Sequence, residues 1–136
     1  MKEQDELVHE GMELYWAHSY QAAVEKFTLA AEQGNAAAQC MLGYCSYHGD
    51  GVTQDYQKAV EWFEKSAVQG DVDACWMLFD CLREGLGVEK DIPKAIKWLE
   101  KGALLGDYDA QDELEYLAKQ GLKEAIDALE RFRNRK

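Results

Sequence analysis

Cysteine and histidine are the residue types in this chain whose spacing could support metal or nucleophilic chemistry. Cys45 and His48 are three residues apart, which would place both side chains on one face of a helix. Cys81 follows Cys45 by 36 residues and could supply a third ligand. A zinc site needs about four convergent ligands. We therefore expect no metal here, only a small buried thiol beside a histidine at a helix end.

Two glycine-rich segments, residues 49–51 and 85–87, invite comparison with phosphate-binding loops. They lack the preceding strand and the following Lys-Ser/Thr that cradle a phosphate, so a tight turn between helices explains these glycines better. His9 and His18 lie far in sequence from Cys45, and no histidine is placed with a nucleophile and a carboxylate in a catalytic arrangement. The sequence predicts no enzyme activity, no catalytic residue and no cofactor.

The remaining candidates are side chains that could contact a partner protein. Tyrosine and tryptophan offer a large rigid surface with one polar group, and arginine or lysine could bind a carboxylate. Candidates within one predicted helix are spaced by three or four residues, which places them on one stripe of that helix. The candidates are Met12, Tyr15, Tyr44, Tyr47, Trp76, Asp80, Arg83, Asp112, Tyr116 and Lys119. The alternative is that the aromatic residues pack between neighbouring helices and touch no partner.

Such a stripe needs helices to position it, and the chain repeats itself with a period of 36 residues. Leu42, Leu78 and Leu114 are spaced by 36, as are Trp62 and Trp98. Apolar residues inside a unit recur every three or four positions, the period of an amphipathic helix. Each unit is therefore predicted to be a helix A, a glycine loop and a helix B, with both tryptophans in the core.

Polar and glycine residues mark the predicted helix ends. Side-chain oxygens can cap the first turn of a helix, and glycine suits the left-handed residue that ends one. The expected caps are Asn35, Asp71 and Asp107 for helix A, and Asp55 and Asp91 for helix B. Helix A is expected to end at Gly49 or Gly85 and helix B at Gly70 or Gly106, with Pro93 in a first turn.

These signals predict one all-α repeat domain over residues 1–136, a right-handed α–α superhelix of about four helix-turn-helix repeats. The first unit is 1–35, two full units are 36–71 and 72–107, and 108–136 is a truncated capping unit whose closing helix covers 122–133. In such an array helix A lines the concave side.

The two central units resemble Sel-like repeats, the Sel-one-like (SLR) branch of the tetratricopeptide-like helical repeats. The resemblance rests on residues 38–43, on 49–52, and on Asp55, Ala59 and Trp62, with the same pattern 36 residues later. The first unit is more similar to a plain tetratricopeptide unit, through Gly11, Ala23, Phe27 and Ala30. The resemblance implies an adaptor or scaffold that binds a peptide or helix of another protein.

The chain departs from the family pattern at three positions. Ser46 and Leu82 occupy a position that is usually Tyr in the family. Phe79 stands where the preceding unit has Gly43, at the close crossing of helices A and B. A large ring needs extra room there, so we expect a local shift in that pair.

The formal net charge of -11 could simply keep the protein in solution, but it also bears on which partners are favoured. It disfavours nucleic acids and anionic membranes and favours a protein or peptide of basic or apolar character. The first six residues contain no apolar signal core, and no apolar run approaches the length of a membrane span.

The four cysteines bear on the compartment. Cys40 and Cys45, like Cys75 and Cys81, would lie about 7.5–9 Å apart along a helix, too far for a relaxed disulfide. We expect reduced thiols and a cytoplasmic location. Two alternatives stay open: a structural or self-associating (dimerising) repeat element, and a hydrolase-like relative of cysteine-rich secreted repeat proteins. The latter carry a disulfide pair in each unit and a signal sequence.

Overall fold

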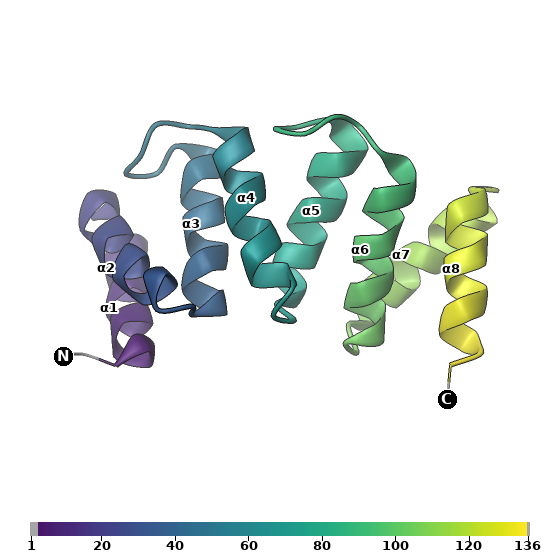
Figure 1. Cartoon of the computed structure of the whole chain (residues 1–136), viewed down its shortest axis with the longest axis horizontal. Helices are drawn as coiled ribbons and strands as arrows, with labels where there is room; N and C mark the ends of the chain where they lie inside the picture. Colours follow the sequence, from purple (N-terminus) through teal and green to yellow (C-terminus); the bar gives the residue numbers. More distant parts are fainter. Residues whose placement is uncertain (1–2, 136) are drawn as a thin grey trace. The chain divides into compact units, whose positions relative to one another are not determined.

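The computed structural model describes residues 3–135, and over that range the chain forms eight α-helices and no strand (Figure 1). Met1, Lys2 and Lys136, at the polar ends of the chain, lie outside the described residues. The helices are α1 (Gln4–Trp16), α2 (Tyr20–Glu32), α3 (Ala36–His48), α4 (Tyr56–Ala67), α5 (Val72–Glu84), α6 (Ile92–Leu104), α7 (Tyr108–Lys119) and α8 (Lys123–Arg133). The predicted all-α class of helix-turn-helix repeats is confirmed.

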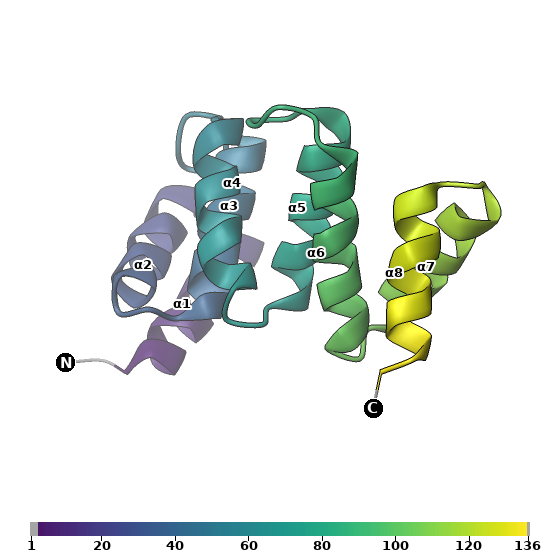
Figure 2. The same ribbon diagram turned by 45° about the vertical axis from the view of Figure 1, so that its right-hand side comes forward.

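The helices form two compact units, which we describe separately. Unit 1 ends at Asp71 and holds α1 to α4, and unit 2 begins at Val72 and holds α5 to α8. In unit 1 each helix packs on the next one in the chain. In unit 2, α5 packs on α6, while α6, α7 and α8 contact one another (Figure 2). Odd-numbered helices are the predicted A helices and even-numbered helices the B helices.

Most of the predicted caps are present. The side-chain oxygens of Asn35, Asp55, Asp91 and Asp107 each accept a hydrogen bond from the backbone N–H three residues later, at 2.9–3.2 Å. A cap of this kind stabilises a helix by about 1 kcal/mol. Gly49 has a φ of 78° and adopts the predicted left-handed conformation at the end of α3. Glycine suits this position because it has no Cβ and enters the left-handed region without steric cost.

Unit 1 is closed by a glycine on each A helix that faces a buried ring from the B helix. Phe27 and Phe63 are completely buried. A Cβ added to Gly43 would lie 2.5 Å from Phe63 Cδ1, and one added to Gly11 would lie 2.6 Å from Phe27 Cε1. Glycine is required at both crossings because any side chain would occupy the space of the ring.

At the equivalent helix crossing of unit 2, the large aromatic ring comes from the A helix and not from the B helix. Phe79 on α5 replaces the glycine, and Leu99 on α6 stands where unit 1 has Phe63; both are almost fully buried. The extra room that the Phe79 ring needs is therefore supplied by the smaller Leu99. The sequence-based expectation considered only the A helix and overlooked this exchange of volume.

The prediction that Trp62 and Trp98 are core residues holds only in part. Both pack against the buried clusters, but both remain partly exposed. The Nζ atoms of Lys65 and Lys101 lie 4.8 and 5.5 Å from the centroids of the respective rings. Each indole thus has one face on the core and one beneath a lysine, a cation–π arrangement.

Candidate partner-binding surface

The predicted residues on α1 hold the first helix pair to the loop that follows α3. Met12 and Tyr15 are half-buried and pack against the core of unit 1. The Tyr15 hydroxyl donates a 2.7 Å hydrogen bond to Asp50 Oδ2. Burial, reinforced by this bond and the carboxylate's charge, raises the pKa of Tyr15 far above its ordinary value. The phenol therefore stays a hydrogen-bond donor throughout the physiological range.

On α3 the two predicted tyrosines belong to a continuous run of ring contacts. Tyr44 meets Phe63 edge-on at 5.5 Å and stacks on His48 at 6.3 Å. Tyr47 meets His48 at 5.0 Å and Tyr56 at 5.1 Å, both edge-on. Both tyrosines remain partly exposed. The rings thus pack between helices, as the structural alternative expects, and keep some accessible surface, as a binding surface requires.

In unit 2, Trp76 contributes its indole N–H to the fold. Nε1 donates a 2.6 Å hydrogen bond to Asp107 Oδ2, the same oxygen that caps the first turn of α7 through the N–H of Ala110. The ring also meets Phe79 edge-on at 5.8 Å. Trp76 therefore fastens α5 to the start of α7, and only part of its surface is left for a partner.

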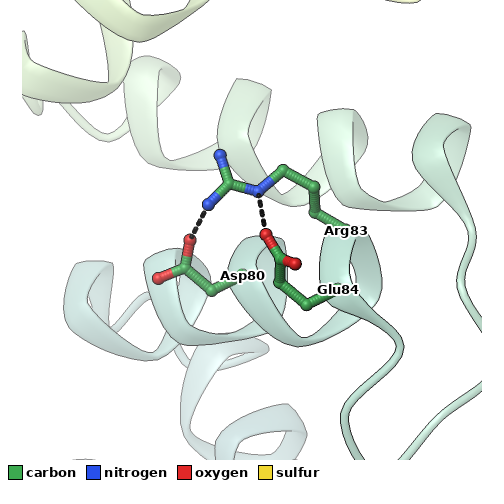
Figure 3. A network of polar contacts seen from close by, with 3 residues as sticks. All are labelled: Asp80, Arg83 and Glu84. Atoms are coloured by element: carbon green, nitrogen blue, oxygen red, sulfur yellow. Dashed lines mark hydrogen bonds and ion pairs between the residues drawn. The ribbon is translucent and has the colours of Figure 1, made fainter.

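Asp80 and Arg83 form a polar cluster with Glu84 (Figure 3). Arg83 Nη2 donates a 3.1 Å hydrogen bond to Asp80 Oδ1, and Arg83 Nε lies 3.3 Å from Glu84 Oε1 without hydrogen-bond geometry. The guanidinium also lies over the Phe79 ring, 4.8 Å from its centroid. Burial raises the pKa of Asp80, although Arg83 acts in the opposite direction. Two carboxylates already surround Arg83, which weakens its predicted role as a site for a partner's carboxylate.

The last three predicted residues, on α7, are the most accessible. Asp112, Tyr116 and Lys119 are exposed, with 58% of the Tyr116 surface open to solvent. Lys119 borders a shallow hollow between α7 and α8 that Ile126 also lines. Of the predicted residues, Asp80 and Arg83 contact each other directly, and the others lie on the A helices where the sequence analysis placed them.

The search by helix-A position missed aromatic residues at the loop end of unit 1. Trp16 is 71% exposed and meets Tyr15 edge-on at 5.5 Å, and Tyr20 meets Tyr15 at 5.1 Å. A Cβ added to Gly51 would lie 2.7 Å from the Tyr20 backbone, so the loop after α3 packs directly on the start of α2. We call the four rings that contact one another here the loop-end aromatic cluster: Tyr15, Trp16, His18 and Tyr20. The density of tyrosine on both sides of the two loops is the signal that could have revealed it.

Neither metal binding nor thiol chemistry gains support. The described residues contain no group of three or more His, Cys, Asp or Glu side chains that could hold a metal ion. All four cysteines are buried, and none of them forms a disulfide. Burial raises the pKa of Cys45 to about 12 and that of Cys81 to about 11, which leaves little thiolate to act as nucleophile or ligand. Within the described part of the chain, no helix is both long and apolar enough to cross a membrane.

Comparison with known proteins places these helices in a family. A family model described as the Sel1 repeat matches residues 36–71 and 72–107. A protective antigen of uropathogenic Escherichia coli, c5321, which displays an SLR fold, is similar over 93% of this chain with 31% identity and a TM-score of 0.82. A Sel1 repeat protein from Oxalobacter formigenes is similar over 92%, with 31% identity and a TM-score of 0.80.

A third solved structure is Helicobacter pylori cysteine rich protein B, with 30% identity, a TM-score of 0.64, and coverage of 66% of this chain and 68% of that one. The chain spans only 29% of the E. coli antigen and 54% of the Oxalobacter protein. No curated protein matches the sequence.

Proposed function

The chain belongs to the Sel1 repeat family, whose members are in general protein-interaction modules and typically non-enzymatic scaffolds, and from that premise we propose that this protein is a non-catalytic adaptor. It binds a peptide or helix of a partner protein on the exposed faces of its A helices, α1 and α3 in unit 1 and α5 and α7 in unit 2.

One observation carries the proposal: aromatic side chains at non-repeating A-helix positions keep exposed surface while the repeated positions are buried. Leu42, Leu78 and Leu114, which recur every 36 residues, are all buried. Tyr47 is partly exposed and Tyr116 is mostly exposed. Rigid aromatic rings of this kind lose little conformational entropy on binding and often dominate the affinity of an interface.

Capture of partners from cell extract tests the proposal when the variants spare the fold. Tyr44 packs on Phe63, and Trp76 donates a hydrogen bond to Asp107. Removal of either side chain would therefore also destabilise its unit. The better variant is Tyr47→Ala combined with Tyr116→Ala, compared with unmodified protein by quantitative mass spectrometry. Leu29→Ala is the matched control, because Leu29 is 50% exposed but lies on the B helix α2.

We expect the double variant to lose partners that the Leu29→Ala control retains, with unchanged circular dichroism for both. Retention of the same partners in equal amounts by all three proteins would refute the A-helix surface. Equal losses in the control would show that general surface hydrophobicity, and not these helices, governs capture.

Self-association is the second candidate, and exposed apolar residues at the α6–α7 turn favour it. Leu104, Leu105 and Tyr108 are 51%, 47% and 78% exposed and lie within five residues. Clustered exposed apolar residues commonly mark an interface. Light scattering over a concentration series separates the two candidates: a mass that doubles with concentration, and stays monomeric in Leu105→Asp, would favour the dimerising element.

A further inference from the structure

We propose that the loop end of unit 1 recognises a cationic side chain, arginine or lysine, in the bound segment of the partner. The cation lies over rings of the loop-end aromatic cluster and beside the carboxylate of Asp50. This inference rests on the proposed function, because Tyr15 belongs to both surfaces, and it names the chemistry of the occupant.

The rings offer several faces to a cation at one end of the unit. Contacts run from Trp16 through Tyr15 to Tyr20, whose hydroxyl lies 2.7 Å from His18 Nδ1. All these contacts are edge-on, with interplanar angles of 65–87°. An edge-on neighbour leaves the face of a ring uncovered by that partner. A ring face carries the negative part of the quadrupole, which attracts guanidinium and ammonium groups.

Asp50 supplies the negative charge beside these rings. Its Oδ2 is held by the Tyr15 hydroxyl, so the carboxylate has a defined place between the first and second helix pairs. A carboxylate offers about four lone-pair sites, and the bond to Tyr15 uses one of them. Asp50 can therefore accept further hydrogen bonds from a guanidinium, and charge-assisted bonds of this kind are stronger than neutral ones.

The negative charge of unit 1 favours a cationic side chain as the occupant of this site. Residues 1–71 hold 12 Asp and Glu but 4 Lys and no Arg, a formal charge of -8, whereas residues 72–136 carry -3. The helices α1 and α3 contain no lysine or arginine. The described lysines lie on the B helices, where Lys26 pairs with Glu10 at 3.2 Å and Lys65 covers Trp62. No lysine or arginine of α1 or α3 therefore competes for the rings or for Asp50.

A neutral apolar segment would fit this surface less well. It would cover the Asp50 carboxylate without supplying a compensating charge, and burying an ionised group without a partner is costly. An acidic segment would meet the repulsion of a strongly negative unit. A segment bearing arginine gains both the ring contacts and the carboxylate.

The test uses two synthetic peptides that differ only in charge. One is an acetylated and amidated glycine–serine octapeptide with two arginines; in the other, citrulline replaces both arginines and keeps their shape. The protein carries 5-fluorotryptophan, and the fluorine resonance of Trp16 is assigned with Trp16→Phe. A cation–π contact together with a charge-assisted hydrogen bond predicts roughly tenfold tighter binding of the arginine peptide at low salt. Its binding should shift the Trp16 resonance and leave that of Trp98 unmoved.

Variants locate the site by fluorescence anisotropy of the labelled arginine peptide. Asp50→Asn removes the charge but keeps an oxygen that can accept the Tyr15 hydroxyl, and Trp16→Leu changes a side chain that is mostly exposed. Glu25→Gln is the matched control, since it removes one negative charge from an exposed position of α2 in the same unit. We expect several-fold weaker binding for Asp50→Asn and Trp16→Leu and little change for Glu25→Gln.

Each contrary result has its own meaning. Equal binding of the arginine and citrulline peptides would overturn the cation preference and leave the proposed function standing. Equal weakening by Glu25→Gln and Asp50→Asn would overturn the site, because net charge alone would then explain the affinity. Absence of any Trp16 shift at 1 mM arginine peptide would overturn the inference as a whole, while the partner-capture experiment decides the proposed function independently.

Discussion

The substitution Gly43→Ala tests how the helix pairs of unit 1 close. Alanine gains about 1 kcal/mol over glycine inside a helix. The new Cβ would lie 2.5 Å from Phe63 Cδ1, well inside the 3.4–4 Å of ordinary contact. Phe63 is completely buried and Tyr44 packs on its edge at 5.5 Å, so the ring has little room to retreat. Overpacking of this kind costs about 1–3 kcal/mol.

We therefore expect Gly43→Ala to lower the free energy of unfolding by up to about 2 kcal/mol after the gain in helix propensity is subtracted. Gly102→Ala is the matched control on α6. Gly102 is also buried within a helix, but its added Cβ would meet Ala110 Cβ at 3.5 Å and Cys75 Cβ at 3.9 Å, both ordinary contacts. That variant should be stabilised by about 0.5–1 kcal/mol.

Urea unfolding followed by circular dichroism measures both effects. The double variant Gly43→Ala, Phe63→Leu adds a second check, because it reproduces the smaller B-helix residue of unit 2. It should recover at least part of the loss, with a coupling energy of about 1 kcal/mol or more. Stabilisation by Gly43→Ala, as by Gly102→Ala, would refute the steric argument.

Three further predictions concern the thiols, the indole of Trp76 and a helix cap. An unfolded thiol has a pKa of 9.0, whereas the pKa is about 12 for folded Cys45 and about 11 for folded Cys81. Above pH 9 the unfolded chain therefore binds fewer protons than the folded chain. The free energy of unfolding consequently falls as the pH rises. Urea midpoints at pH 8 and 10 should show this fall, and Cys45→Ala should reduce it; an equal fall in the variant would contradict the shift. Trp76→Phe leaves Asp107 Oδ2 without the indole N–H and should cost unit 2 about 1 kcal/mol in urea unfolding, so a neutral effect would show that the 2.6 Å bond contributes nothing. Asp91→Ala removes the cap of α6 and should cost about 1 kcal/mol, whereas Asp91→Asn, which can still accept the Lys94 N–H, should cost clearly less in the same measurement.

The features that could be predicted from the sequence are those that depend on neighbours along the chain. A cap joins Asp55 to the backbone N–H of Lys58, and a left-handed end requires only Gly49 itself. The 36-residue period extended these assignments to the other units, because matched positions in a repeat occupy matched environments. Helix bounds and caps were therefore predictable to within a residue or two.

Contacts between distant residues were not predictable in the same way. The bond from Trp76 to Asp107 spans 31 residues and depends on how α5 and α7 meet. The proximity of Asp50 to Tyr15 depends on a loop that packs on the backbone of Tyr20. The exchange between Phe79 and Leu99 was accessible in principle, because position 99 could have been compared with position 63. The sequence pattern of the A helix alone did not reveal the exchange, because the compensating smaller residue, Leu99, lies on the B helix.

The A-helix aromatic residues show why a choice between core and binding site was the wrong question for this chain. Tyr44 and Tyr47 each contact two neighbouring rings while remaining partly exposed. A ring anchored in this way is already ordered, so it loses little entropy when a partner covers its exposed part. Packing within the unit thus makes these residues better suited to binding, not less, and only substitutions at the exposed members, such as Tyr116, can separate binding from folding.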